Sequence, residues 1–492
     1  MSKPKTLGEL RSSAWGAASM RQRRVKDEMR ANLIRKLEKG EPLFSGIIGY
    51  EDTVTPQVVN AILSKHNMIL LGLRGQAKSR ILRNLTYLLD EEIPVMAGCE
   101  INDDPFAPLC RACRVSLEEK GDNAPIAFLP RSDRYVEKLA TPDVTIADII
   151  GDVDPIRAAR SGLHLSDELT IHYGLLPRSN RGIFAINELP DLAGKIQVGL
   201  FNILQEGDVQ IKGYPIRLLL DVVMVFTANP EDYTARGKII TPLKDRIGSE
   251  IRTHYPATLE HGIAITEQEA WLARHADERL LIPKYIKEIV ESVAFQARED
   301  KKVDKRSGVS QRLPISVLEN VVSNAERRAL LNKEKRIVPR VCDVYAALPS
   351  MTGKIELEYE GELKGADKVA QELVRGAVGQ IFSHYFDAMD FQQIVNWFDL
   401  GGTLKLSDDA PAQESFDQLR VIQGLAERAS TLGARKKEEP PLLVSACEFI
   451  LDGLYALRKI SRNEEKGYTA SEKKRSEAFF DDQAGRARKS YN

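Results

Sequence analysis

Two patterns of hydrophobic positions divide the chain. Between 47 and 256, short apolar runs alternate with stretches that have the period of a helix; MILL at 68–71 and IFAI at 183–186 are two of these runs. This alternation predicts a parallel sheet whose strands are joined by crossover helices. From 261 to 346, apolar residues recur with a helical period and strand signals are few. The sequence therefore favours an α/β part followed by an all-helical part.

The segments outside these parts have patterns of their own. At 20–40, apolar residues recur at every fourth position before a glycine, which predicts a basic helix docked on the body of the protein. Glu28 and Glu38 interrupt the charge of this helix, so we interpret its polar face as solvated rather than as a nucleic-acid surface. KIELEYEGE at 354–362 predicts a short hairpin, and further helices follow it.

Composition and charge exclude several classes of protein. A chain of 492 residues is too long for a single hydrophobic core. Its 70 Lys and Arg residues are balanced by 71 Asp and Glu residues, so no global field would hold it on nucleic acid or on an anionic membrane. No stretch approaches the roughly 20 apolar residues of a membrane span, and the N-terminus lacks an apolar signal core. We expect a cytoplasmic protein without membrane insertion and with no clear nucleic-acid binding.

The segment 67–89 reads as a buried strand, a glycine-containing turn and an amphipathic helix, which is the context of a phosphate-binding loop. In such a loop the backbone amides face the phosphates of ATP, a lysine reaches the β and γ oxygens, and a hydroxyl holds Mg²⁺. Lys78 and Ser79 match these two side chains. The nucleotide-binding residues expected here are Gly72, Gly75, Gln76, Ala77, Lys78, Ser79 and Arg80.

Ala77 departs from the phosphate-loop motif, because a second glycine normally precedes the lysine. An alanine methyl group is tolerable at this position if the φ angle is negative. Taken alone, the segment could also be an ordinary strand-to-helix turn with a solvated lysine.

A second buried strand, 183–186, ends in Asn187 and Glu188, where phosphate-loop ATPases usually carry Asp-Glu. A carboxylate at this end of a strand can orient and deprotonate the water that attacks the γ-phosphate, so Glu188 is the expected base. Asn187 can accept a hydrogen bond from a Mg²⁺-bound water, but it lacks the charge of aspartate. We therefore expect Asn187 to contribute to nucleotide and Mg²⁺ binding, and hydrolysis to be slow.

Further polar residues follow the next elements. A hairpin is expected at 207–220, and the strand after it ends just before Asn229. Arg246 is expected at an exposed helix end, where it could reach the γ-phosphate bound to a neighbouring subunit. That role requires a ring, and the alternative is a surface ion pair with Asp245 or Glu250.

The order of these motifs, from the phosphate loop and the acidic strand through the hairpin and the TANP strand end to the DRI arginine, resembles the AAA+ core. Three stretches also resemble the magnesium chelatase ATPase subunit: GCEINDDPFAPLCRACR at 98–114, IIGDVDPIRAAR at 149–160 and GLLPRSNRGIFAINELPDL at 174–192. MoxR-type ATPases of the same helix-2-insert clade share this layout. The resemblance covers about 44–330.

The resemblance implies roles for individual residues and for the assembly. By it, Asn229 is the sensor-1 residue, Arg246 is the arginine finger acting in trans, and Arg312 in SGVSQRLP is the sensor-2 arginine. It implies an ATP-hydrolysing homo-oligomer, a hexameric ring, that works with a partner bearing a von Willebrand A domain. This chain has no D-x-S-x-S run, so that domain is expected on a separate polypeptide.

The resemblance also implies the fold class, an AAA+ phosphate-loop core with a parallel sheet followed by an all-helical lid and a further helical C-terminal region. The expected parts are an N-terminal helical arm at 1–40, the α/β nucleotide-binding core at 41–260 with a cysteine-containing insert at about 99–135, the lid at 261–346, the C-terminal mainly helical region at 347–462 and a flexible charged tail at 463–492.

Three of the five cysteines are crowded into the insert. Cys110 and Cys113 have the two-residue gap with which two thiolates grip one tetrahedral metal, and Cys99 lies eleven residues upstream. In chelatase-like sequences a further cysteine often follows the first by four positions; here Asp103, a poorer zinc ligand, occupies that place. The cluster could bind zinc, or it could be three reduced thiols beside the nucleotide site.

Other functions stay open on the sequence alone. An ATP-gated assembly scaffold with little hydrolysis is favoured by Ala77 and Asn187. A transcription activator is disfavoured because its GAFTGA loop is absent. The core alone does not identify the substrate on which the motor acts. Related cores serve cofactor insertion, including porphyrin metalation, as well as partner remodelling and metal-centre assembly.

Overall fold

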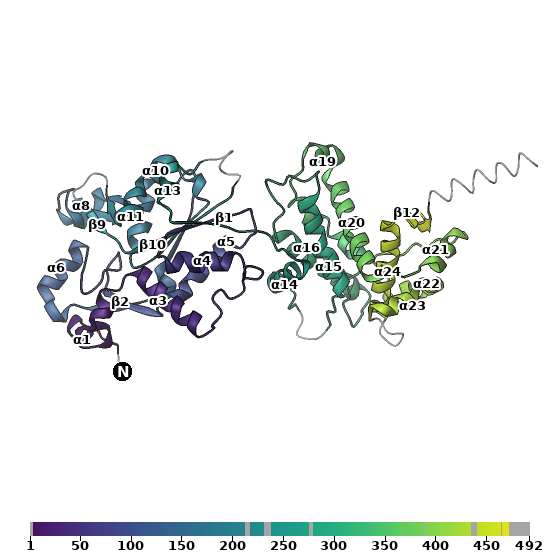
Figure 1. The fold of residues 1–492 in the computed structure, drawn as a ribbon, viewed down its shortest axis with the longest axis horizontal. Helices are drawn as coiled ribbons and strands as arrows, with labels where there is room; N and C mark the ends of the chain where they lie inside the picture. The colour runs from purple at the N-terminus through teal and green to yellow at the C-terminus, as the bar shows by residue number, and fades with distance from the viewer. Residues whose placement is uncertain are drawn as a thin grey trace, which may run out of the picture. The chain divides into compact units, whose positions relative to one another are not determined.

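The protein divides into two compact units, Met1–His254 and Tyr255–Asn492. The computed structural model describes residues 3–211, 217–230, 238–274, 279–387, 389–433, 440–463 and 465–471 (Figure 1). Each unit is described by itself below.

The first unit is built on a five-stranded sheet in which every pairing is parallel. Its strands lie in the order β11-β1-β10-β7-β4. They are β1 (Met68–Leu71), β4 (Tyr135–Leu139), β7 (Gly182–Asn187), β10 (Val222–Ala228) and β11 (Ser249–Arg252). The parallel sheet expected from the sequence is confirmed, and the strand ends that carry the expected site residues meet at its carboxyl edge.

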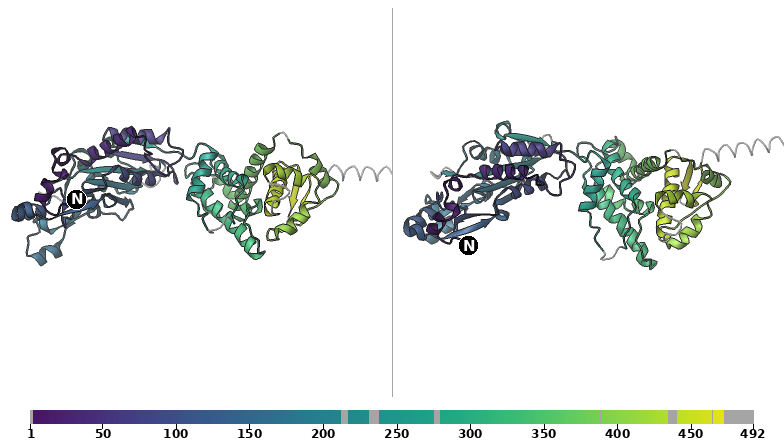
Figure 2. Two further views of the ribbon diagram at one scale, coloured as in Figure 1. Left: turned by 90° about the horizontal axis from the view of Figure 1, so that it is seen from below. Right: turned by 60° about the horizontal axis from the view of Figure 1, so that its bottom comes forward.

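Alternate strand residues face opposite sides of this sheet, because successive side chains of a strand point in opposite directions. One face, which packs on α3 (Val25–Glu38), α4 (Val54–Leu63) and α5 (Lys78–Asn84), holds Met68, Leu70, Ile183, Ala185, Val223 and Val225. The other face holds Ile69, Leu71, Phe184, Ile186, Met224 and Phe226, and its hydrophobic cluster includes residues of α9 (Leu175–Arg178), α10 (Gly194–Gly199), α11 (Phe201–Gln205) and α13 (Thr241–Arg246). Figures 1 and 2 show the helices beside the sheet from three directions. Burial on both faces explains why these strands read as continuous apolar runs.

The helices of the first unit connect the strands or extend the insert. They are α1 (Leu7–Arg11), α2 (Ala18–Arg21), α3 (Val25–Glu38), α4 (Val54–Leu63), α5 (Lys78–Asn84), α6 (Arg111–Lys120), α7 (Ile146–Ile149), α8 (Pro155–Ser161), α9 (Leu175–Arg178), α10 (Gly194–Gly199), α11 (Phe201–Gln205) and α13 (Thr241–Arg246). Three antiparallel pairs accompany them: β2 (Glu92–Met96) with β3 (Ile126–Pro130), β5 (Gly151–Val153) with β6 (Ile171–Tyr173), and β8 (Asp208–Gln210) with β9 (Arg217–Leu219). The last pair is the hairpin expected at 207–220.

The N-terminal helix α3 is docked on the body of the protein, as the sequence predicted, but its polar face is not wholly solvated. Its apolar residues Val25, Met29 and Leu33 are almost fully buried against the sheet. Glu28, expected on a solvated face, is also buried, and its two carboxylate oxygens accept hydrogen bonds of 2.7 Å from the guanidinium of Arg134. The charge of Glu28 therefore belongs to a buried ion pair and not to the surface.

The second unit is helical and contains α14 (Leu259–Glu269), α15 (Lys284–Glu299), α16 (Arg312–Leu331), α17 (Val341–Ala346), α18 (Pro349–Thr352), α19 (Tyr359–Lys364), α20 (Ala366–Phe386), α21 (Gln392–Asp399), α22 (Ala412–Leu419), α23 (Leu425–Ala429) and α24 (Pro440–Ala456). One hydrophobic cluster runs from Ala270 to Tyr468 through these helices. The regions expected as a lid at 261–346 and a C-terminal region at 347–462 thus share one core.

Two details of the second unit differ from the expectation. The hairpin expected in KIELEYEGE is wrong, since 359–364 form α19. Gly361 in this helix lies so close to the Lys302 carbonyl that an added Cβ would be 2.4 Å from its oxygen, which explains a glycine inside a helix. Within the segment expected as a flexible tail at 463–492, Gly467–Ala470 form strand β13, which pairs with β12 (Ile460–Asn463). Residues 472–492 of that segment lie outside the described residues.

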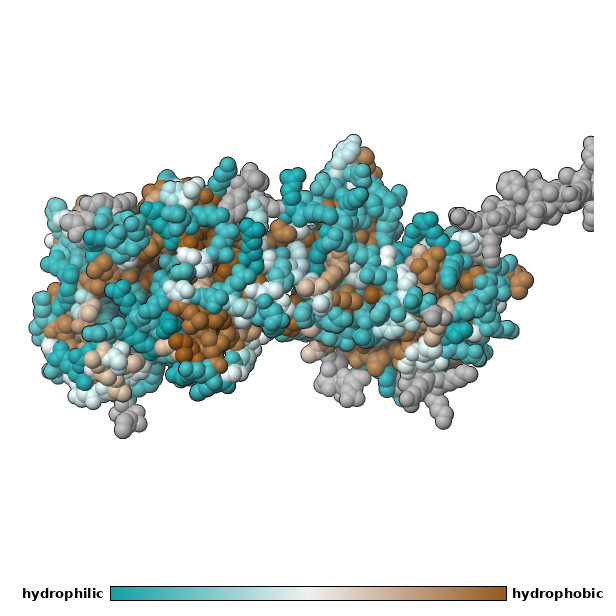
Figure 3. Space-filling model, viewed as in Figure 1, coloured by the Kyte–Doolittle hydropathy of each residue, from teal (hydrophilic) through white to brown (hydrophobic). Residues whose placement is uncertain are grey.

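The surface carries both polar areas and exposed apolar side chains. The face seen in Figure 3 is mainly hydrophilic, with smaller brown areas on both units. Large apolar side chains that are exposed include Leu400, Leu363, Tyr359, Leu331 and Ile156. No helix among the described residues combines the length and the apolar character that a membrane span needs.

Candidate functional site

The glycine-rich loop follows β1 directly and leads into α5. Gly72 is needed for space, because a Cβ there would lie 1.9 Å from Thr253 Oγ1 and 2.2 Å from Gln76 Oε1. Thr253 Oγ1 also donates a hydrogen bond of 2.7 Å to Gln76 Oε1, and the hydroxyl of Tyr50 lies 3.0 Å from the Gln76 carbonyl oxygen. The loop is therefore fixed from β11 and from the turn before α4. Gly75, with φ of +74°, uses the left-handed conformation that favours glycine.

Ala77 also has a left-handed backbone, with φ of +55° and ψ of +15°. The condition under which alanine was tolerable, a negative φ, is therefore not met. A Cβ in this conformation approaches the following carbonyl oxygen and costs about 1–2 kcal/mol relative to glycine. Ala77 thus adopts the backbone conformation of the glycine that the motif normally has, and this conformation is strained for an alanine.

Lys78 turns back over the loop. Its Nζ donates to the carbonyl oxygens of Gly72 and of Leu73, the latter at 3.0 Å, and to Oδ1 of Asn229 at 2.9 Å. Asn229 follows the end of β10, so two of the expected site residues, 151 positions apart in the sequence, are in direct contact. The acceptors around the ammonium group in these hydrogen bonds are neutral oxygens, which phosphate oxygens can replace.

Asn187 is the centre of the polar network at the end of β7. Its Oδ1 accepts hydrogen bonds from Ser79 Oγ at 3.4 Å and from Thr227 Oγ1 at 3.1 Å. Its Nδ2 donates to Glu137 Oε1 on the neighbouring strand β4. The amide of Asn187 thereby joins α5, β10 and β4.

Glu137 was not among the residues expected from the sequence. It lies in YVEKL, where no motif marks it, and strand pairing alone places it two residues before the position opposite Asn187. Its carboxylate also accepts hydrogen bonds from Arg83 Nε at 2.8 Å and Nη2 at 3.2 Å. The Arg83 side chain is 65% exposed, whereas that of Glu137 is 20% exposed. Arg83 can therefore leave while the carboxylate stays beside Asn187 and Ser79.

Glu188 lies beside this network with a left-handed backbone, φ of +55°. Its N–H donates a hydrogen bond of 3.1 Å to Thr227 Oγ1, the hydroxyl that also contacts Asn187. A non-glycine residue in this conformation is strained, and such residues concentrate at functional sites.

Arg80, the last residue expected in the loop, lies in the first turn of α5 and is half-buried.

Arg246 ends α13 and is held by its own chain. Its Nε donates to Gln205 Oε1 at 3.0 Å, a terminal nitrogen donates to the Pro242 carbonyl at 2.7 Å, and the guanidinium lies 4.9 Å from the ring centroid of Phe201. Among the ion pairs of the described residues, Arg246 pairs with neither Asp245 nor Glu250, the two alternative partners; Glu250 pairs with Lys244 at 2.8 Å and with Arg252 at 3.7 Å. Arg312, the expected sensor-2 residue, opens α16 in the second unit with an exposed side chain.

The expected cysteine cluster is assembled in the insert. One ligand atom from each of Cys99, Asp103, Cys110 and Cys113 lies within 4.8 Å of all the others. Hydrogen bonds from the thiols of Cys110 and Cys113 lower the pKa of Cys99 to about 4, and burial raises the pKa of Asp103 to about 7. The structure thus brings the three cysteines together, and the carboxylate of Asp103 lies with them.

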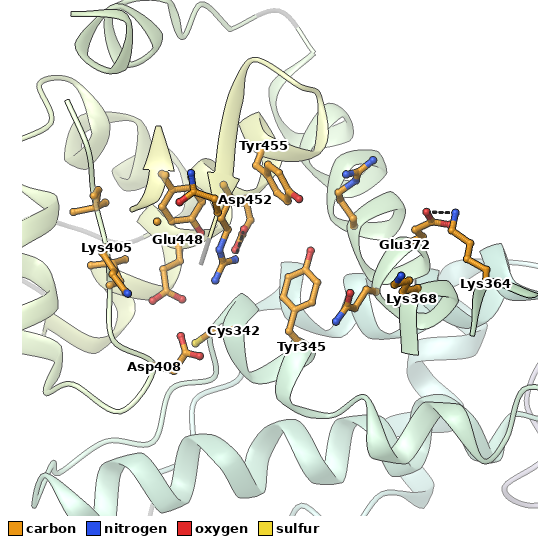
Figure 4. Close-up of a pocket in the computed structure, with 18 residues that line it drawn as sticks. Cys342, Tyr345, Lys364, Lys368, Glu372, Lys405, Asp408, Glu448, Asp452 and Tyr455 are labelled. Atoms are coloured by element: carbon orange, nitrogen blue, oxygen red, sulfur yellow. Dashed lines mark hydrogen bonds and ion pairs between the residues drawn. The ribbon is translucent and has the colours of Figure 1, made fainter. Parts of the chain in front are cut away.

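The second unit contains a cavity of about 680 Å³ that the sequence did not indicate (Figure 4). Glu448 and Asp452 of α24 line it, and Arg462 donates a hydrogen bond of 2.9 Å to Asp452 Oδ1. Burial raises the pKa of Glu448 to about 7. Lys364, Lys368 and Lys405 also line the cavity. None of the expected nucleotide-site residues lines it.

Known proteins match part of the chain. The magnesium-chelatase subunit ChlI homolog of Methanocaldococcus jannaschii is 30% identical over 214 residues, 42% of this chain and 53% of that protein. The magnesium-chelatase 38 kDa subunit of Cereibacter sphaeroides is 29% identical over 237 residues, 47% of this chain and 65% of that protein. The chain thus spans between about half and two thirds of the length of these relatives.

No protein-family model matches the chain. Among solved structures, a chain in the complex of the magnesium chelatase subunits BchI and BchD is 21% identical, with 65% of this chain and 98% of that chain covered and a TM-score of 0.35.

The left-handed conformation of Ala77 predicts that Ala77→Gly stabilises the first unit. We expect the free energy of unfolding to rise by roughly 0.5 kcal/mol, since relief of the φ strain outweighs the greater chain entropy of glycine. The measurement is urea denaturation of the full chain, with hydrogen exchange in β1 and β10 reporting on the first unit. In the exposed middle of α3, Ala31→Gly is the matched control and should lower stability by about 1 kcal/mol. Equal losses in both variants would contradict the strained geometry at Ala77.

Proposed function

We propose, from the AAA+ core that this chain shares with the ATPase subunits of magnesium chelatase, that the first unit binds ATP with Mg²⁺ and hydrolyses it. The observation that supports this most is the convergence at one edge of the sheet. There, Lys78 contacts Asn229, and Asn187 contacts Ser79, Thr227 and Glu137. This arrangement joins a phosphate-binding lysine to oxygen ligands suited to Mg²⁺.

In this proposal the loop amides and the start of α5 bind the phosphates, and Lys78 exchanges its carbonyl acceptors for the β and γ oxygens. Ser79 and Asn187 offer the oxygen atoms for Mg²⁺, which would neutralise charge developing on the transferred phosphoryl group. Glu188 acts as the base for the attacking water, and Asn229 orients that water. Since Thr227 holds both Asn187 and the Glu188 backbone, the metal ligand and the base are positioned by one hydroxyl.

Glu137 supplies the negative charge that Asn187 lacks. The two side chains are in direct contact across neighbouring strands. A carboxylate therefore lies beside residue 187, the position that carries a Mg²⁺ ligand in phosphate-loop ATPases. An aspartate at 187 would place two carboxylates against each other, which disfavours ionisation of both. The neutral amide and the displaced carboxylate are therefore a compatible pair.

The chain would act as an oligomeric ring, because Glu188 and Arg246 serve the same phosphate from different copies. Arg246 is held by Gln205 and Pro242 through hydrogen bonds to neutral oxygens, so its positive charge is available for a neighbour's γ-phosphate. A hexamer, a sensor-2 role for Arg312, and a separate partner with a von Willebrand A domain are part of this proposal. Hydrolysis would move the β8–β9 hairpin and the helix α8 to remodel or load that partner.

A second candidate function is an ATP-gated scaffold that binds nucleotide and hydrolyses it little. The strain at Ala77 and the neutral side chain of Asn187 favour it. Phosphate release by the purified protein, measured with and without a partner, separates the scaffold from the motor.

The test of the proposed ATPase pairs two substitutions. Lys78→Ala should abolish ATP binding, because it removes the only side-chain cation expected in the loop to reach the β and γ oxygens. Glu188→Gln should leave ATP binding unchanged and lower turnover by about 100-fold or more, the usual weight of a general base. Binding is measured with a fluorescent ATP analogue and turnover by phosphate release. Glu206→Gln, at an exposed glutamate of the same unit, is the control; wild-type turnover in Glu188→Gln would refute its assignment.

A charge exchange tests the role of Glu137. We expect Glu137→Gln to raise the Mg²⁺ concentration for half-maximal ATP binding by about tenfold, since one charge near the ion is lost. The double variant Glu137→Gln with Asn187→Asp returns the charge to β7 and should restore most of the affinity. Glu118→Gln, on the exposed side of α6, is the control for loss of a surface charge. An unchanged Mg²⁺ requirement in Glu137→Gln would show that the carboxylate only supports Asn187.

A further inference from the structure

We propose that Cys99, Cys110, Cys113 and Asp103 form a zinc site that holds the insert of the first unit together. Their ligand atoms all lie within 4.8 Å of one another. In a tetrahedral site with Zn–S bonds of about 2.3 Å, two sulfur atoms are about 3.8 Å apart. The Sγ atoms of Cys99 and Cys110 are 4.0 Å apart. Zinc can therefore enter this cluster with only small movements of its side chains.

Asp103 gives independent evidence for a cation. The residue is fully buried, and its Oδ2 accepts a hydrogen bond of 2.9 Å from the backbone N–H of Cys110. Among the described residues, none donates a hydrogen bond to its other oxygen, Oδ1. A buried carboxylate oxygen without a partner is costly, and a bound cation removes that cost.

The backbone around the cysteines is arranged for thiolates. Cys99 Sγ accepts N–H groups from Ile101 at 3.4 Å and from Asp103 at 3.3 Å, and Cys110 Sγ accepts the N–H of Cys113 at 3.4 Å. Such hydrogen bonds offset negative charge on metal-bound sulfur and orient the ligands. Three thiolates select a soft or borderline metal such as zinc over Mg²⁺ or Ca²⁺, which prefer oxygen ligands. Four protein ligands leave no open position, so the site would be structural.

A metal site would stabilise the insert where apolar packing is weak. Within α6, Cys113 is the only fully buried residue, so the helix gains little from apolar packing. The loop before α6 in turn supports the start of the acidic strand: Asn102 Nδ2 donates to the Arg178 carbonyl at 2.8 Å, and Asn180 Nδ2 donates to the Ile101 carbonyl at 3.1 Å. Zinc would thereby stabilise the segment that leads into β7.

The experiment measures metal in the full chain, produced without a polyhistidine tag in medium containing zinc. The zinc content, measured by inductively coupled plasma mass spectrometry, should be about one ion per chain in the wild type. Cys110→Ser and Cys113→Ser should reduce it to the background. Cys342→Ala, which removes a buried thiol of the second unit, is the matched control and should keep the zinc.

Two measurements keep the proposal testable if the serine variants do not fold. On the wild-type protein, a mercurial that modifies thiols should release the zinc to a colorimetric chelator. With Co²⁺ in place of zinc, the protein should show thiolate charge-transfer absorption and the bands of a tetrahedral ion, and Asp103→Cys should strengthen the charge-transfer absorption. Folded wild-type protein without metal, with reduced thiols or with a disulfide between Cys99 and Cys110, would overturn the proposal.

Discussion

The hydrogen bonds of the Asn187 side-chain amide are the interactions on which the proposed nucleotide site depends. The amide accepts hydrogen bonds from α5 and β10 and donates one to β4, so a single group fixes the relative positions of the phosphate loop and two neighbouring strands. An aspartate could not donate to Glu137. The departure from the usual Asp-Glu pair is thus explained by its neighbour, because the charge has moved one strand along the sheet rather than being lost.

Backbone strain marks the same region. Ala77 in the loop and Glu188 just after β7 both have a left-handed backbone that glycine adopts more easily. Each is held by its surroundings, Ala77 by the loop that Thr253 and Tyr50 fix through Gln76, and Glu188 by the hydroxyl of Thr227. Strain that is imposed by a rigid frame is a way to keep reactive groups in one geometry. The frame here is the doubly covered sheet, whose strands are buried on both faces.

The sequence predicts the frame better than the site. Apolar runs indicated the parallel strands because burial on both faces leaves no polar alternation, and the motif order placed the loop, Asn187, Glu188 and Asn229 at strand ends. Glu137 could not be found in this way, since it lies in a half-buried edge strand and reaches the site only through pairing of β4 with β7. The sign of φ at Ala77 and the buried ion pair of Glu28 with Arg134 also depend on tertiary packing, which local patterns do not encode. For KIELEYEGE, the alternation was misleading because 359–364 are helical, and the close approach of Gly361 to the Lys302 carbonyl, which requires a glycine there, is a tertiary contact.

In the proposed ring, one ATP molecule is hydrolysed by groups from two copies of this chain. Mixing Glu188→Gln protein with Arg246→Ala protein tests it most directly, since each variant alone lacks one of the two groups. We expect both variants to be inactive by themselves and their mixture to regain a fraction of the wild-type rate, because some junctions then combine an intact Glu188 with an intact Arg246. If the two proteins assemble together and the mixture stays inactive at every ratio, the two residues do not act across a junction between copies.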